Sequence, residues 1–359
     1  MADLRILTVV GARPQFVKAA SVSRAIAARD GIQEILVHTG QHFDAGMSQI
    51  FFDELGLQSP RLDLGIHGGG HGEMTGKMLA ALERVIIDER PDLVLVPGDT
   101  NSSLAGALAA AKLAIPIAHL EAGLRSFNRC MPEEINRVLT DHLSTLLLCP
   151  TETAVVNLRR EGIVEGVHNV GDVMYDAVCV AAAASGRSQI LDKLGLVERS
   201  YALATVHRAE STESNAALTE IVDFLRRQAR DRIIVFPVHP RTRKRIAEWR
   251  IDLGDILACE PFGYLDMHRL LRSAVAVFTD SGGLQKEAYF HQVPCVTLRS
   301  ETEWVETIEA GWNRLWKGPD YAPRREISAF GDGHAAKRGV ELIFNFLKCQ
   351  PRAGSAPSF

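Results

Sequence analysis

The sequence lacks several features that mark common classes of protein. Its 359 residues carry a formal net charge of only −4, which gives no electrostatic reason to expect binding to nucleic acid or to an anionic membrane. The six cysteines include no CxxC pair and are typical of reduced thiols in a cytosolic protein. No apolar run is long enough to cross a bilayer, and the first residues lead into a predicted strand without a signal segment. We therefore expect a cytoplasmic protein.

Two glycine-rich nucleotide signatures are also missing. No GxGxxG follows a predicted strand, and no GxxxxGK precedes a serine or threonine, so neither the dinucleotide fingerprint nor a P-loop is present. His67 and His71 flank three glycines, which suggests a metal site. A glycine spacer would not hold two imidazoles on one helix face, and no third ligand is obvious. We predict a flexible active-site loop here, and neither a metal nor an added cofactor.

Short apolar runs alternate with amphipathic segments along the whole chain. The runs are nearly continuously apolar, as expected for parallel strands that are covered on both faces. The predicted strands are residues 5–10, 34–38, 93–96, 115–120, 201–206, 233–238, 274–279 and 295–298. The predicted helices include residues 14–29, 76–89, 214–227 and 335–347. This alternation predicts an α/β protein with two Rossmann-like, doubly wound parallel sheets.

A small-residue stretch near residues 168–190 separates two similar halves. We expect an N-terminal domain over residues 1–170 and a C-terminal domain over residues 171–345. Residues 346–359 would form the end of the last helix and a tail rich in Pro, Gly, Ser and Ala, which we expect to be mobile.

Polar residues gather where the predicted strands end. In open parallel sheets, ligands bind beyond the carboxyl ends of the strands. Two sheets with this arrangement predict one cleft between two domains. The strand-end segments are residues 11–14, 39–42, 98–101, 119–125, 206–208, 238–240, 260–262, 280–281 and 299.

The most informative segment is residues 280–287, DSGGLQKE, which follows an apolar strand and opens a helix. Ser281, Gly282 and Gly283 would leave backbone N–H groups to bind a phosphate at the helix N-terminus, where no Cβ hinders approach. Glu287 lies one turn further on and could reach the group attached to that phosphate. The alternative is an ordinary strand–helix turn.

Arg13 and Lys18, after the first strand, would supply cations to a diphosphate. The alternative is that Arg13 only caps a turn.

Three carboxylates and one imidazole are the candidates for proton transfer. Asp99, Glu121 and Glu133 would crowd the first domain's face, which pushes pKa values apart. Asp99 could instead cap a helix, and Glu133 could simply favour a helix N-terminus, as Glu134 should. Glu121 ends a strand and has no capping role, and His207 could bind a substrate hydroxyl.

With these motifs in place, the chain resembles the non-hydrolysing UDP-N-acetylglucosamine 2-epimerase family over about residues 4–348. The motifs that carry the resemblance are residues 11–14 with Lys18, 39–42, 98–100, 121–125, 132–137, 207–208, 237–240 and 280–287. The resemblance implies a GT-B arrangement with the active site in the interdomain cleft, a C-terminal helix that crosses back to the first domain, a homodimer and no added cofactor. The further candidates for binding the UDP-sugar substrate are Gln41, Arg137, His239, Phe262 and Arg299.

The resemblance also implies a mechanism. A base removes the C2 proton while UDP leaves C1, and the 2-acetamidoglycal is reprotonated on its other face before UDP adds back. The departing diphosphate must be stabilised, and two proton transfers on opposite faces need two acid/base groups. The sequence does not assign a carboxylate to either face.

Two departures from the family pattern bear on the substrate. Ala209 stands where UDP-N-acetylglucosamine epimerases usually have a second arginine, and residues 304–306 read WVE instead of RPE. These residues, with the loop at 65–76, look like the branch that acts on UDP-2,3-diacetamido-2,3-dideoxy-glucuronate for lipopolysaccharide O-chains, and they put a regulatory second nucleotide-sugar site in doubt. Arg129 is a candidate for the C6 carboxylate or a solvated loop residue.

Three alternatives remain open at this point. The same chemistry could act on plain UDP-N-acetylglucosamine, the protein could be a GT-B glycosyltransferase, or it could bind a nucleotide sugar as a regulator without turnover. A hydrolysing epimerase would be recognised by sustained release of UDP.

Overall fold

The computed structural model describes residues 3–41 and 57–349. The chain divides into two compact units, one formed by Met1–Ala177 with Ala329–Phe359 and the other by Val178–Ser328. Residues 329–345, which the expected limits assign to the C-terminal domain, belong to the first unit because they lead into and form the helix that completes its core.

The first unit is built on a parallel sheet with seven strands among the described residues, in the order β3-β2-β1-β4-β5-β6-β7. The strands are β1 (Leu4–Val10), β2 (Ile32–His38), β3 (Leu62–Asp63), β4 (Leu93–Pro97), β5 (Ile117–Leu120), β6 (Leu146–Cys149) and β7 (Val167–Asn169). Its helices are α1 (Arg13–Ala27), α3 (His71–Glu89), α4 (Asn101–Lys112), α5 (Pro132–Leu143), α6 (Glu152–Arg160), the first part of α7 (Val173–Ala184) and α15 (Ala335–Cys349). The order reverses between β1 and β4, which is where such sheets bind ligands.

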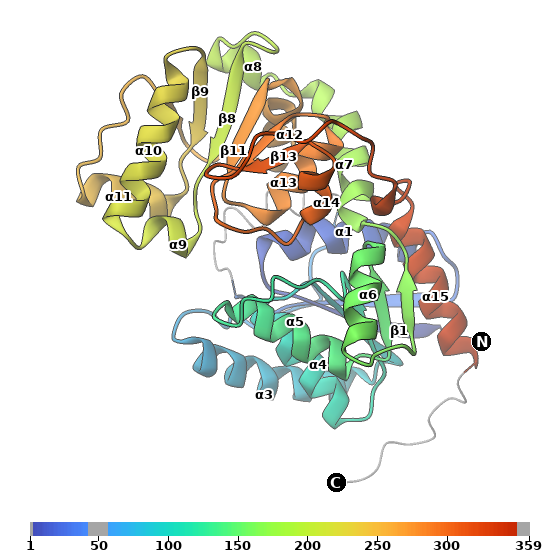
Figure 1. Cartoon of the computed structure of the whole chain (residues 1–359). Helices are drawn as coiled ribbons and strands as arrows, with labels where there is room; N and C mark the ends of the chain where they lie inside the picture. The colour runs from blue at the N-terminus through green and yellow to red at the C-terminus, as the bar shows by residue number, and fades with distance from the viewer. Residues whose placement is uncertain (1–2, 42–56, 350–359) are drawn as a thin grey trace. The chain divides into compact units, whose positions relative to one another are not determined.

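Helix α15 packs beside α1, where it covers one face of the first sheet (Figure 1). Its buried side chains include Val340, Ile343 and Leu347, which lie on one face at helical spacing. The Asp176 carboxylate accepts hydrogen bonds from the backbone N–H groups of Ala335 (3.0 Å) and Ala336 (2.8 Å), so it caps the helix N-terminus. On the other face of the sheet, α3 and α4 close a second apolar core.

The second unit repeats the architecture with a parallel sheet in the order β10-β9-β8-β11-β12-β13. The strands are β8 (Tyr201–Thr205), β9 (Ile233–Pro237), β10 (Leu257–Cys259), β11 (Ala276–Thr279), β12 (Cys295–Thr297) and β13 (Asn313–Leu315). Its helices are α8 (Ile190–Leu194), α9 (Ala209–Thr212), α10 (Asn215–Ala229), α11 (Pro240–Glu248), α12 (Tyr264–Ser273), α13 (Gly282–Phe290) and α14 (Val305–Glu309). Figure 1 shows α10 and α13 flanking this sheet.

The predicted fold class of two doubly wound parallel sheets is confirmed. The eight predicted strands all occur, although residues 115–116 precede β5 and residues 274–275 precede β11. The short strands β7, β10 and β13 were not predicted and have only three residues each, and the mixed sequences of β7 and β13 carry no apolar run that would predict them. None of the described helices is long and apolar enough to cross a membrane.

Candidate functional site

The loops after β1, β4 and β5 meet at the carboxyl edge of the first sheet. Lys18, one turn into α1, forms an ion pair with the Glu121 carboxylate at the end of β5, and both side chains are buried. Gly98 has a positive φ of 66°, and a Cβ at this position would lie 3.1 Å from the Lys18 Nζ atom. Glu121 also has a left-handed backbone, with φ 72°, which is costly for a residue with a side chain. This strained and crowded edge is typical of a functional site.

Asp99 joins the same edge through Arg137 of α5, to which it is ion-paired. Burial pushes the pKa of Asp99 upward, but the positive charges of Arg137 and then of Lys18 outweigh it and hold this pKa below its ordinary value. The side chain that caps α4 is Thr100, whose Oγ1 accepts a hydrogen bond from the Ser103 N–H (3.2 Å). Asp99 is therefore an ionised carboxylate without a capping role.

Glu134 has a structural role beyond favouring a helix N-terminus, and the sequence did not predict this role. It is buried and accepts hydrogen bonds from the Ser126 N–H (2.9 Å), the Phe127 N–H (2.9 Å) and Arg137 Nη1 (2.9 Å). It thereby fixes the loop that follows β5 to the arginine that holds Asp99. The signal available in the sequence was the doubled acid at residues 133–134, of which the second one faces inward.

Two glutamines connect these loops. Gln41 accepts hydrogen bonds from the Ser102 N–H (3.1 Å) and hydroxyl (2.7 Å) at the first turn of α4. The buried Gln15 accepts from the Gly11 N–H (2.8 Å) and donates to the Pro97 carbonyl (2.8 Å), so it joins the loops after β1 and β4. Gln15 was not predicted, because a polar residue in a helix first turn is usually solvated.

For the other predicted residues of this edge, the structure describes no side-chain contact within the site. Glu133 is half-buried in the first turn of α5 and makes no hydrogen bond or ion pair with another described residue. Arg13 is the first residue of α1, but its side chain lies outside the described part of the structure. His42, which ends one of the motifs, and the tail beyond Cys349 also lie outside the described residues.

A buried ionic network lies behind this edge and was not predicted. His119 is fully buried on β5, with Nδ1 2.6 Å from Asp141 Oδ1 and Nε2 2.9 Å from the Gly98 carbonyl oxygen. Asp141 also accepts from Arg125 Nη1 (2.7 Å), and Arg125 binds Glu161 with two hydrogen bonds of 2.7 Å each. Burial raises the pKa of Asp141, but His119 and Arg125 outweigh it and hold this pKa below its ordinary value.

At the carboxyl edge of the second sheet, Asp280 organises the segment after β8. Its carboxylate is fully buried and accepts hydrogen bonds from the N–H groups of His207 (3.0 Å) and Arg208 (2.9 Å). The His207 Nδ1 atom lies 3.3 Å from the Asp280 carboxylate, so this acid orients the ring. Burial raises the pKa of Asp280, but the bonds from His207 and Arg208 outweigh it and lower this pKa. His207 remains 40% exposed, so its ring can meet a ligand.

The N-terminus of α13 has the geometry that the sequence predicts. Ser281 caps the helix, with its hydroxyl accepting from the Leu284 N–H (3.5 Å). Packing leaves no room for a side chain at Gly282, because a Cβ there would lie 2.2 Å from Glu303 Oε1. At Gly283 the nearest atom to a Cβ would be the Ser281 hydroxyl at 4.0 Å, so the space is open. An open glycine at a helix N-terminus can admit an anion close to the backbone.

Arg299, at the end of β12, lies beside this turn. Its Nη1 donates to Glu303 Oε2 (3.0 Å). Its Nε and Nη2 groups are buried and have no hydrogen-bond partner in the described structure. Buried guanidinium donors without acceptors are costly unless a ligand satisfies them.

The other three candidates of the second unit have structural partners as well. His239 caps α11, where its Nδ1 accepts from the Arg241 N–H (3.3 Å), and its ring lies 5.9 Å from that of His207. Glu287 Oε1 lies 4.0 Å from His268 Nε2, and Phe262 packs against the apolar core of the unit.

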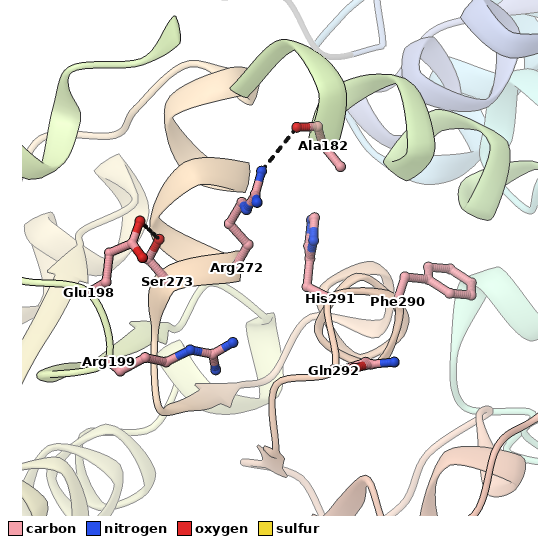
Figure 2. Close-up of a pocket in the computed structure, with 8 residues that line it drawn as sticks. All are labelled: Ala182, Glu198, Arg199, Arg272, Ser273, Phe290, His291 and Gln292. Atoms are coloured by element: carbon pink, nitrogen blue, oxygen red, sulfur yellow. Dashed lines mark hydrogen bonds between the residues drawn. The ribbon is translucent and has the colours of Figure 1, made fainter. Parts of the chain in front are cut away.

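One surface hollow of the described structure lies away from both edges. It has a volume of about 500 Å³ in the second unit and lies at the amino ends of β8, β11 and β12 (Figure 2). Figure 2 shows Arg199, Arg272 and His291 around it, with Arg272 bonded to the Ala182 carbonyl (3.1 Å). A second hollow of about 370 Å³ lies in the first unit. Arg129 lines it beside Phe127 and His142.

No cluster of three or more His, Cys, Asp and Glu side chains among the described residues could hold a metal ion. His71 is the first residue of α3, and its Nδ1 lies 3.1 Å from Asn101 Nδ2.

Comparison with known proteins finds a family match over most of the chain. Residues 24–343 match the family model of UDP-N-acetylglucosamine 2-epimerase. A homolog of this enzyme from Methanococcus maripaludis is 49% identical, covering 95% of this chain and 100% of that protein. The UDP-2,3-diacetamido-2,3-dideoxy-D-glucuronate 2-epimerase of Pseudomonas aeruginosa is 52% identical, covering 87% of this chain and 88% of that protein.

Solved structures agree with this match. The Methanocaldococcus jannaschii UDP-GlcNAc 2-epimerase, in complex with UDP-GlcNAc and UDP, has a TM-score of 0.88 and 41% identity, covering 96% of this chain and 99% of that one. The Neisseria meningitidis enzyme bound to UDP-GlcNAc has a TM-score of 0.86 and 29% identity, covering 95% and 100%. The chain is therefore an isomerase that acts on UDP-sugars, and it belongs to the UDP-N-acetylglucosamine 2-epimerase family.

Proposed function

We propose that the protein epimerises C2 of UDP-2,3-diacetamido-2,3-dideoxy-D-glucuronate, giving the mannuronate epimer for O-antigen synthesis in the cytoplasm. The 52% identity with the P. aeruginosa enzyme of that name supports this substrate. The observation that carries the chemistry is the Asp99 carboxylate, which Arg137 and Lys18 keep ionised at the edge where Glu121 also lies.

Residues 304–306 support the same branch. Trp304 is buried, and the Lys286 ammonium lies 3.7 Å from the centre of its ring, a cation–π contact. The arginine that is usual at this position would place a second cation beside Lys286. The tryptophan avoids this repulsion and instead makes a favourable contact with Lys286.

Binding of the diphosphate falls to cations and backbone N–H groups. We propose that the α13 N-terminus at Ser281, Gly282 and Gly283 binds phosphate oxygens, with Arg299 donating to the nucleotide through its two unsatisfied N–H groups. Lys18 and Arg13 stabilise the charge that develops on UDP as the bond to C1 breaks. Gln41, Arg137, His239, Phe262 and Glu287 complete the proposed set of residues that bind or hold the substrate.

Proton transfer falls to Asp99, Glu121, Glu133 and His207. An ionised carboxylate can accept the C2 proton as UDP departs, and a second acid must then deliver a proton to the other face of the glycal. Asp99 suits the first role because its pKa is lowered. Asp280 keeps the His207 ring oriented for contact with the sugar.

Proton NMR in D2O tests the proposal. The enzyme is incubated separately with the UDP-diacetamido-glucuronate and with UDP-GlcNAc, and loss of the C2 proton signal is followed with growth of the manno isomer. We expect turnover of the uronate. Turnover of UDP-GlcNAc alone would assign the substrate of the M. jannaschii relative instead. Absence of C2 exchange with both would overturn the epimerase chemistry and favour transfer of the sugar to an acceptor.

We also propose a homodimer, as the resemblance implies. Light scattering coupled to gel filtration tests it, since the monomer mass is 39.3 kDa.

A further inference from the structure

His119 lies between two groups that can only accept hydrogen bonds. Its Nε2 faces the Gly98 carbonyl oxygen at 2.9 Å, and its Nδ1 faces an Asp141 carboxylate oxygen at 2.6 Å. A neutral imidazole has one N–H donor and one lone pair. A lone pair directed at either oxygen would leave two buried acceptors in repulsive contact. Both ring nitrogens must therefore carry hydrogen.

The charges around the ring support this. Asp141 accepts from Arg125 as well as from His119, and Arg125 is also paired with Glu161. An imidazolium at residue 119 brings the net charge of this network to zero, and of the other three charged groups Asp141 and Arg125 are buried whereas Glu161 is exposed. The nearby Cys149 adds no charge, because burial raises the pKa of its thiol. The next titratable group outward is His142, with Nε2 3.5 Å from Glu161.

The bond from His119 fixes the peptide that precedes Asp99. Gly98 has a left-handed backbone, and because a glycine has access to many backbone conformations, a bond to its carbonyl restricts the loop. Asn136 of α5 donates to the Asp99 carbonyl (3.0 Å), and Arg137 pairs with the Asp99 carboxylate. Asp99 is thus held at the carbonyl before it, at its own carbonyl and at its carboxylate. The side chains of Lys18 and Glu121 lie next to the Gly98 Cα. A shift of this loop therefore changes their distances to Asp99.

We propose that His119 is an imidazolium paired with Asp141. It acts as a positioning residue that keeps Asp99 at a fixed distance from Lys18 and Glu121. The role of Asp99 rests on the proposed function, whereas the protonation of His119 does not.

The first test is nitrogen-15 NMR of histidine side chains in the intact protein at about pH 8, above the ordinary histidine range. The His119 signal is identified by its absence from His119→Gln or from His119→Asn. We expect both of its ring nitrogens to show the shifts and the one-bond couplings of protonated nitrogen. A lone-pair shift at either nitrogen would overturn the imidazolium. Because this readout needs no substrate, it stands even if the proposed activity fails.

The second test separates positioning from folding. A glutamine amide at residue 119 can donate to the Gly98 carbonyl in place of Nε2, whereas the shorter asparagine reaches Asp141 alone. We expect kcat to fall roughly 100-fold in His119→Asn and to stay within about fivefold of wild type in His119→Gln, with KM nearly unchanged in both. Thr140→Val is the control, because this buried hydroxyl has no hydrogen-bond partner in the described structure.

Equal loss of kcat in both His119 variants, or loss of thermal stability with unchanged kcat, would assign His119 a purely structural role. If wild type turns over neither UDP-sugar, the proposed function fails while the NMR result still decides the state of His119.

Discussion

Lys18 and Glu121 form a buried ion pair, although the sequence suggests separate roles for them. Lys18 was expected to bind phosphate and Glu121 to move a proton. In the structure each also sets the charge of the other's surroundings, and both act on Asp99: the Lys18 charge lowers the pKa of Asp99 and the Glu121 charge raises it. The phosphate-binding and proton-transfer groups of this edge are therefore electrostatically coupled.

This coupling predicts a non-additive pair of substitutions. Lys18→Met leaves the buried Glu121 carboxylate without this cation and should lower the free energy of unfolding by about 3–5 kcal/mol. Adding Glu121→Leu should recover part of that loss, although the double variant should have no activity. Urea unfolding of both single variants and the double variant measures the coupling energy. Additive losses would show that the pair contributes no coupling.

Arg137 should control the pH dependence of the reaction. Arg137 is the strongest influence that lowers the pKa of Asp99 against the opposing effect of burial. Arg137→Gln should therefore raise this pKa, so that the acid limb of the kcat/KM profile moves to higher pH and activity at neutral pH falls roughly 10- to 100-fold. Arg137→Lys keeps the charge and should leave the limb nearly in place. An acid limb at the same pH in wild type and Arg137→Gln would show that Asp99 is not the group that titrates.

Gly282 and Gly283 offer a matched comparison on α13. A methyl group at Gly282 meets the Glu303 carboxylate at 2.2 Å and should displace it from Arg299, which lowers the melting temperature by about 2–4 °C. Gly283→Ala has space and replaces a helical glycine, so its melting temperature should stay the same or rise.

Binding of UDP, measured by calorimetry, separates the two effects. Both alanine variants should bind UDP at least about tenfold more weakly if the phosphate lies against this turn, because a Cβ blocks close approach to the backbone. Unchanged affinity in Gly283→Ala would place the phosphate elsewhere.

The sequence predicts the sheets and the strand-end positions well because both follow from local patterns. Apolar runs of four to seven residues predicted β1, β4, β8 and β11, and the polar residues after them lie at the carboxyl edges. The Ser-Gly-Gly turn at Ser281 was identified for the same reason, since a local motif determines it.

Partners distant in sequence could not be predicted in this way. Lys18 meets Glu121 across 103 residues, and Asp280 binds the His207 N–H across 73. His119 and Asp141 resemble an ordinary strand histidine and a solvated helix acid until the fold buries both. Their pairing depends on the register of β5 against α5, which no single segment encodes.

A histidine pair in the second unit, with His268 buried and His291 half-buried, predicts acid sensitivity. His268 Nδ1 lies 2.8 Å from His291 Nε2, beside Glu287 and Arg272. Burial, together with His291, lowers the pKa of His268 well below its ordinary value. Burial and then Arg272 lower the pKa of His291 to about 4.

The sign follows from comparing the folded and unfolded chains. An unfolded histidine titrates near pH 6.5, so between about pH 6.5 and 4 the unfolded chain binds more protons than the folded one. Stability should be fully present above this window and fall as pH drops through it, by up to about 1.4 kcal/mol for each pH unit and each histidine. Asp141 and Asp280, whose pKa values are lowered, lose their contribution only below the ordinary aspartate range, outside this window.

Urea unfolding at several pH values between 7 and 4.5 measures this slope. His291→Gln removes one titrating group while its amide can still bond to His268, so the slope should fall to about half. His334→Gln is the control, because His334 is exposed in the first unit and should leave the slope as it is in wild type. An unchanged slope in His291→Gln would mean that other groups cause the acid sensitivity.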